Sequence, residues 1–183
     1  MSPVPPHGDD AVRTGLLWIA EDFRRIVGSA TPVELAAPSD GTRWTNRQLL
    51  FHLVLGQNIA RVSIPLFGAF SRLPPGASRA WSALLELFTR PYDWVNWFGS
   101  AAGARALSTA SMERMMDRST RAILAWYDRA DAADLARGMS VPPSWDPYFS
   151  AWMNRADMLS WAPKHYRHHR AQLTLSSLPD VPG

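Results

Sequence analysis

A chain of 183 residues, 46% of them hydrophobic, is long enough to form one domain with a substantial core. Cysteine is absent, which excludes disulfides, zinc–thiolate sites and a cysteine nucleophile. The net charge is only +3, and its arginines are scattered among acidic residues rather than clustered, a pattern that does not indicate nucleic-acid binding.

The N-terminal segment, residues 1–9, is predicted to be disordered. It has neither the basic start nor the apolar run of a signal peptide, so no signal peptide is expected. No later segment has the ~18 uncharged apolar residues that a membrane span requires. We therefore expect a cytoplasmic protein that contacts neither membrane nor nucleic acid. Residues 10–178 are expected to form one helical bundle, and residues 179–183 a C-terminal tail.

The first helix is predicted over residues 10–27, where apolar side chains recur at helical spacing, and Gly28 is expected to end it. The second starts after Thr45, because Thr45 and Gln48 have the spacing of a capping box. Its first turns are apolar almost all round, which places this helix deep in the protein. Pro65 is expected to kink or end it.

An aromatic-rich helical region follows over residues 79–98, interrupted by Pro91, with Gly99 and Gly103 expected in the loop after it. A further helix is predicted over residues 109–130. Its expected inner stripe is Met112, Met115, Ser119, Ala122, Ile123 and Trp126.

Residues 131–147 read as an irregular connection, and the last helix lies within residues 150–176. Pro163 either kinks this helix or begins a new one, and both versions leave residues 165–175 helical. No segment alternates with period two for long enough to propose a sheet. Several long helices with short breaks predict an all-α antiparallel bundle.

Three histidines have the pattern of metal ligands. His165 and His169, four residues apart on a helix, lie on one face and can turn ring nitrogens towards one ion. His52 lies in the buried second helix, where a lone imidazole costs a few kcal/mol to dehydrate unless it has a partner. Metal ligation or a hydrogen bond to a carbonyl would meet that need. His168 could replace His169 at three-residue spacing, or lie at the surface or behind the ligands.

The spacing of the last pair alone is a weak signal, and Tyr166 stands where a zincin protease would have its glutamate. Two longer motifs resemble the DinB/YfiT-like metalloprotein superfamily. The first is Trp44-Thr45 leading into a helix with His52-Leu53. The second, about 110 residues later, is His165-x-x-His168-His169-Arg170-x-Gln172-Leu173.

The resemblance implies a four-helix bundle in up-down-down-up order, here with an extra aromatic-rich helical insert. It also implies a metal centre with His52, His165 and His169 as ligands, zinc, nickel or iron as the metal, and water at the open positions. Gln172 and Arg170 are candidates to support the ligands, although Arg170 is expected to point away from the His165 face and to make a surface or interface contact.

Several members of that superfamily resemble thiol S-transferases and isomerases, which implies an enzyme that transfers a low-molecular-weight thiol of the mycothiol or bacillithiol type to a small electrophile, or isomerises it. The expected partners are a small-molecule substrate and a second copy of the chain in a homodimer. Two alternatives remain open: a non-enzymatic metal- or ligand-binding stress-response protein, and a structural bundle in which the histidines are only hydrogen-bonded.

Overall fold

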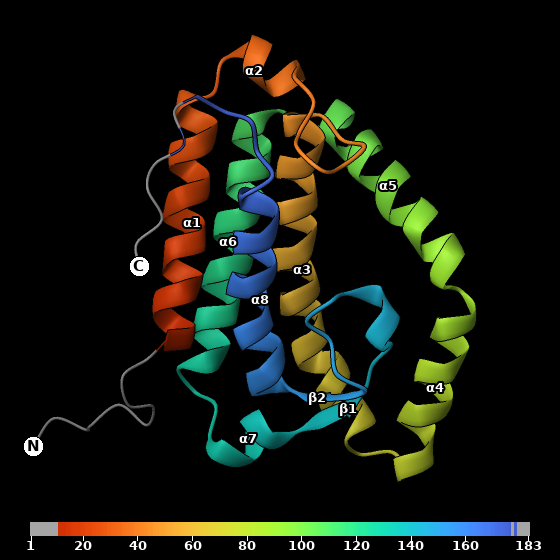
Figure 1. Cartoon of the computed structure of the whole chain (residues 1–183). Helices are drawn as coiled ribbons and strands as arrows, with labels where there is room; N and C mark the ends of the chain where they lie inside the picture. The colour runs from red at the N-terminus through yellow and green to blue at the C-terminus, as the bar shows by residue number, and fades with distance from the viewer. Residues whose placement is uncertain (1–10, 177, 179–183) are drawn as a thin grey trace, which may run out of the picture.

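Four long helices form the core of the fold and carry both histidine motifs (Figure 1). The computed structural model describes residues 11–176 and 178, so the predicted N-terminal disorder and C-terminal tail lie outside the described residues. Each core helix packs against two of the others, in the ring α1, α6, α3, α8. Their bounds are Ala11–Ser29 for α1, Asn46–Phe70 for α3, Thr109–Tyr127 for α6 and Arg155–Arg170 for α8.

The remaining elements connect the core helices or flank them. In Figure 1, α1 and α8 run in one direction and α3 and α6 in the other, and α4 and α5 lie outside the core on the α3 side. Within the described residues the protein is all-α except for two three-residue strands. The bounds are Pro32–Ala36 (α2), Pro75–Leu87 (α4), Thr89–Ala106 (α5), Ala132–Ala136 (α7), Gly138–Ser140 (β1), Pro143–Trp145 (the 3-10 helix η1) and Trp152–Asn154 (β2).

Helix α3 is the central helix of the protein, and it begins as predicted. The Thr45 hydroxyl accepts from the Gln48 backbone N–H, and the Gln48 side chain accepts from the Thr45 N–H. Of the two outcomes expected for Pro65, a kink or the end of the helix, the second is wrong, because α3 continues to Phe70. Contacts with α5, α6 and α8 stabilise it along its length, which outweighs the one hydrogen bond that proline removes.

Among the described helices, α3 alone is long and apolar enough to cross a membrane by composition, and 61% of its most apolar window is buried inside the protein. Its apolar composition is that of a core helix, because other helices surround it.

The inner stripe of α6 is rotated slightly from the prediction. Its buried residues are Met112, Met116, Ser119, Thr120, Ile123, Leu124 and Tyr127.

The aromatic-rich region divides differently from the prediction. The break between α4 and α5 falls at Phe88, and Pro91 lies in the first turn of α5, where a missing N–H is tolerated. The predicted loop glycines, Gly99 and Gly103, are helical. A Cβ on Gly103 would come 2.1 Å from Phe51 Cζ, so this glycine permits the close approach of α5 to α3.

The last helix is continuous through Pro163 and ends at Arg170, before the predicted residue 175. Asn154 and Asp157 form a capping box at its start. Pro163 lies against α1 at Gly15, where a Cβ would be 2.7 Å from the proline Cγ. The antiparallel pairing of β1 with β2 was not predicted, and it closes the segment between them into a loop beside α3 and α8.

Candidate metal centre

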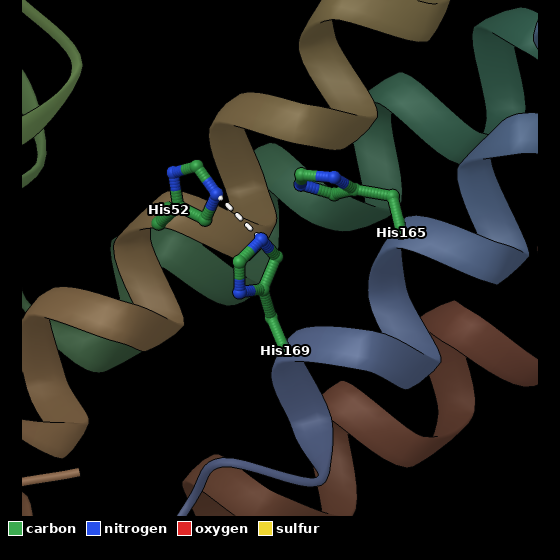
Figure 2. A group of neighbouring side chains, drawn as sticks. All are labelled: His52, His165 and His169. Atoms are coloured by element: carbon green, nitrogen blue, oxygen red, sulfur yellow. Dashed lines mark hydrogen bonds between the residues drawn. The ribbon is translucent and has the colours of Figure 1, made fainter. Parts of the chain in front are cut away.

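The three predicted histidines converge in the space between α3 and α8 (Figure 2). His52 comes from α3, and His165 and His169 come from successive turns of α8. One ring nitrogen of each lies within 4.8 Å of those of the other two, and the Nε2 atoms of His52 and His169 are 3.2 Å apart. Two nitrogens that bind one tetrahedral zinc at ~2.0–2.1 Å are roughly 3.3 Å apart, so this separation fits a shared ion.

Gly56 provides the space for His165. It lies one turn after His52 on α3, and a Cβ there would come 2.7 Å from Cδ2 and 2.8 Å from Nε2 of the His165 ring. Any side chain at this position would push the imidazole away from the other two. The helical repeat places Gly56 on the same face of α3 as His52, but it does not indicate this role.

Each of the three rings is oriented by an oxygen at its Nδ1. The partners are Asn96 Oδ1 for His52 at 3.2 Å, Asp146 Oδ2 for His165 at 2.9 Å and Gln172 Oε1 for His169 at 2.7 Å. Since an oxygen acceptor pairs with an N–H, these three contacts favour the tautomer of each ring that carries a proton on Nδ1. The Nε2 lone pairs then face one another, as in metal sites whose histidines are held from behind.

The Nε2 atoms of His52 and His169 are within hydrogen-bond distance of each other, and a cation placed between the three nitrogens would replace that contact (Figure 2). His165 Nε2 is buried and has no hydrogen-bond partner among the described residues. A buried acceptor left in that state costs about 1–3 kcal/mol. A divalent cation would satisfy all three nitrogens at once, and imidazole is a usual ligand for zinc, iron and nickel. The residues present therefore fit a metal ion.

The protonation states also suit metal binding. Burial lowers the pKa of His52 well below its usual value, and the neighbouring His165 and His169 lower it further. Burial, with the nearby His165, lowers the pKa of His169 to about 4. Burial raises the pKa of Asp146, but the hydrogen bonds that its carboxylate accepts, first from His165 and then from the Tyr148 backbone N–H, together outweigh burial and the pKa is lowered. At pH 7, His52 and His169 are neutral, as ligands must be, and Asp146 is charged.

A cavity of about 400 Å³ opens beside the three histidines. Its walls come from α3, α5, α8, the Trp44 loop, and η1 with the segment after it, and they are mostly aromatic. The aromatic lining residues are Trp44, Trp145, Tyr148, Phe149 and Trp161. His168 also lines this cavity, but it is exposed and its ring faces Tyr148 at 6.0 Å between centroids. It lies outside the cluster of three, so the geometry does not favour the alternative in which His168 replaces His169.

Two of the supporting residues were missed from the sequence. Asp146 lies in a connection read as irregular, and Asn96 lies in the aromatic-rich region, so neither had a periodic or motif signal. Gln172 was expected near the ligands and contacts His169.

The expectation that Arg170 points to the surface is wrong. Its side chain is buried, and it donates from Nε and Nη2 to the two carboxylate oxygens of Asp22 on α1, at 2.7 and 3.0 Å. The Tyr166 hydroxyl donates to the same carboxylate at 3.0 Å. A second face of α8, about 100° round the helix from the histidines, is therefore held to α1 by charge and hydrogen bonds. An arginine on a helix is usually solvated unless a carboxylate on a neighbouring helix pairs with it. The sequence of α8 does not show that Asp22 on α1 is such a partner.

Comparison with known proteins gives a family and no individual relative. The model of the DinB superfamily matches residues 16–173. This range includes the three histidines and the residues that orient them. No curated protein and no solved structure matches the chain.

Proposed function

Because the chain belongs to the DinB superfamily, we propose that it binds one divalent metal ion through His52, His165 and His169 and transfers a low-molecular-weight thiol to a small electrophile. The isomerisation of an electrophile by the same thiol is the variant of this reaction in which the thiol leaves again. The observation that carries the proposal is the convergence of three imidazoles whose Nδ1 atoms are all engaged elsewhere.

Zinc, nickel or iron would suit three neutral imidazoles. Three protein ligands leave coordination positions open, as in catalytic sites. When bound, the metal would supply the lowered thiol pKa that makes a thiolate available at neutral pH. The chain has no cysteine, so the thiol must come from a cosubstrate. Such thiols accumulate in a reducing cytoplasm, which is the compartment we propose.

The residues around the metal would do the remaining work. Asp146, Asn96 and Gln172 hold the imidazoles in one orientation, and the aromatic walls exclude water from the attacking sulfur. In an addition to an activated double bond, the sulfur–carbon bond forms, the π-bond breaks, and the proton of the thiol ends on the neighbouring carbon. No further reactant is consumed.

Metal analysis of the purified protein is the first test. We expect about one zinc, nickel or iron ion per chain, and we expect His52→Ala to lose most of it because two ligands on one helix hold an ion weakly. His168→Ala is the matched control, since this exposed neighbour lies outside the cluster and its loss should leave the metal content unchanged. A wild-type protein that binds no divalent metal would contradict the proposal.

The second test follows thiol consumption by the metal-loaded protein. Mycothiol, bacillithiol and glutathione are each incubated with a panel of small electrophiles, and free thiol is measured over time. We expect loss of one thiol and its acceptor in equal amounts, and no loss with His52→Ala. The mostly aromatic cavity also favours a second function, the binding of a small molecule without turnover. Tight ligand binding with no thiol consumption would support that alternative.

A further inference from the structure

The cavity beside the histidines has walls made of flat rings that hold one another in place. Trp44 stacks on His52 with ring centroids 4.6 Å apart and an interplanar angle of 28°. On the other side, the Trp161 ring lies 4.6 Å from His165 and 5.3 Å from Phe149. Flat aromatic surfaces of this kind favour ligands that can stack on them or meet them edge-on.

Apart from the histidines, the described walls of the same cavity offer a ligand no free charged side chain. Within the described part of the chain, no lysine or arginine side chain lines it. Its one carboxylate, Asp146, is engaged with the His165 ring and with the Tyr148 backbone N–H. A charged ligand would therefore lose its hydration without gaining a counter-charge from the walls.

We propose that this cavity takes the electrophile, and that the electrophile is an uncharged, planar aromatic or conjugated molecule of one or two rings. The volume of about 400 Å³ is at the small end for ligand sites, which suits a molecule of this size. The role of this molecule as thiol acceptor rests on the proposed function, but the binding of the molecule to the aromatic walls does not.

Binding is tested without reaction, by calorimetric titration of the metal-free protein, in which no open metal position can bind a carboxylate, with three probes. 3,5-Dinitrobenzamide is planar and uncharged, 3,5-dinitrobenzoate has the same shape with a negative charge, and cyclohexanecarboxamide is uncharged but not planar. We expect the dinitrobenzamide to bind at least tenfold more tightly than either of the others. Equal or tighter binding of the benzoate or of the cyclohexane amide, or no binding of the dinitrobenzamide, would overturn the proposal.

Two tryptophan substitutions on α3 locate the bound ring. Ile59 lines the cavity and is 38% exposed, so Ile59→Trp should fill the space and lower the affinity for dinitrobenzamide at least tenfold. Val62 is 51% exposed and does not line the cavity, so Val62→Trp should leave the affinity within twofold. Unchanged binding to Ile59→Trp would overturn the proposal, because the probe would then occupy another hollow, such as the one at Arg43, Trp94, Trp97 and Phe98.

The outcomes separate this inference from the proposed thiol transfer. If dinitrobenzamide binds as expected and no thiol is consumed with any electrophile, the transferase proposal fails and the ligand class stands. If thiol is consumed with charged or aliphatic electrophiles while planar uncharged ones are neither bound nor converted, the ligand class fails and the transferase proposal stands.

Discussion

Replacing Gly56 with alanine should disrupt the metal centre while leaving the fold intact. The added Cβ would lie 2.7 Å from Cδ2 and 2.8 Å from Nε2 of His165, whereas ordinary contacts begin near 3.4 Å. The ring or the helix must therefore retreat by roughly 0.7 Å, several times the ~0.2 Å tolerance of a metal–ligand distance. Removing a residue that only supports a ligand typically lowers metal affinity 10–100-fold. Because Gly56→Ala displaces a ligand itself, we expect a loss of about 100-fold.

The assay is competition for zinc against a chromogenic chelator, combined with urea unfolding of the metal-free protein. Gly28→Ala on α1 is the matched control, since a Cβ there meets nothing within 4 Å. It should leave zinc affinity unchanged and stabilise the helix by up to about 1 kcal/mol. If Gly56→Ala bound zinc as tightly as the wild type, His165 would not be a ligand in the position described, and the reasoning would be refuted.

Three further predictions concern the groups around the histidines. Asp146→Ala removes the acceptor that orients one imidazole and should lower zinc affinity 10–100-fold in the same chelator assay, with unchanged affinity contradicting the assigned role. The metal-free protein should lose stability as the pH falls from about 6.5 towards 4. The lowered pKa values of His52 and His169 keep these side chains neutral in the folded state, whereas in the unfolded state they take up protons. Urea unfolding midpoints at pH 7.5 and 5.0 test the sign of this effect, and a higher midpoint at pH 5.0 would contradict it. Arg170→Ala leaves the Asp22 carboxylate buried without its charge partner and should cost about 3–5 kcal/mol of unfolding free energy, whereas a loss below about 1 kcal/mol would show that the pair behaves like a surface one.

Features that depend on residues close together in the chain were accessible from the sequence. The capping box at Thr45 is a contact over three residues, and the shared face of His165 and His169 follows from the helical repeat. The all-α class and the family follow from the same periodicity and from two short motifs, and the family match confirms the latter. The assignment of the three histidines as metal ligands stays a prediction, which the convergence of their rings supports.

Helix ends in the aromatic-rich region were less accessible, because tertiary contacts decided them. Gly99 and Gly103 have the composition of a loop, yet both are helical, and the packing of α5 on Phe51 accounts for Gly103. Pro65 and Pro163 are helix breakers by local propensity, and both lie inside helices that neighbouring helices stabilise. Packing free energy outweighs local preference where a helix is surrounded.

The sequence by itself determined the helices, their apolar faces and the histidine pair, because these depend on the helical repeat and on capping contacts over three or four residues. Only the tertiary structure decided what meets the histidines from other segments: Asp146 behind His165, Asn96 behind His52 and the aromatic walls of the cavity. It also decided that Arg170 is buried against Asp22. Such contacts join residues tens of positions apart, and no local pattern encodes which segments will lie side by side.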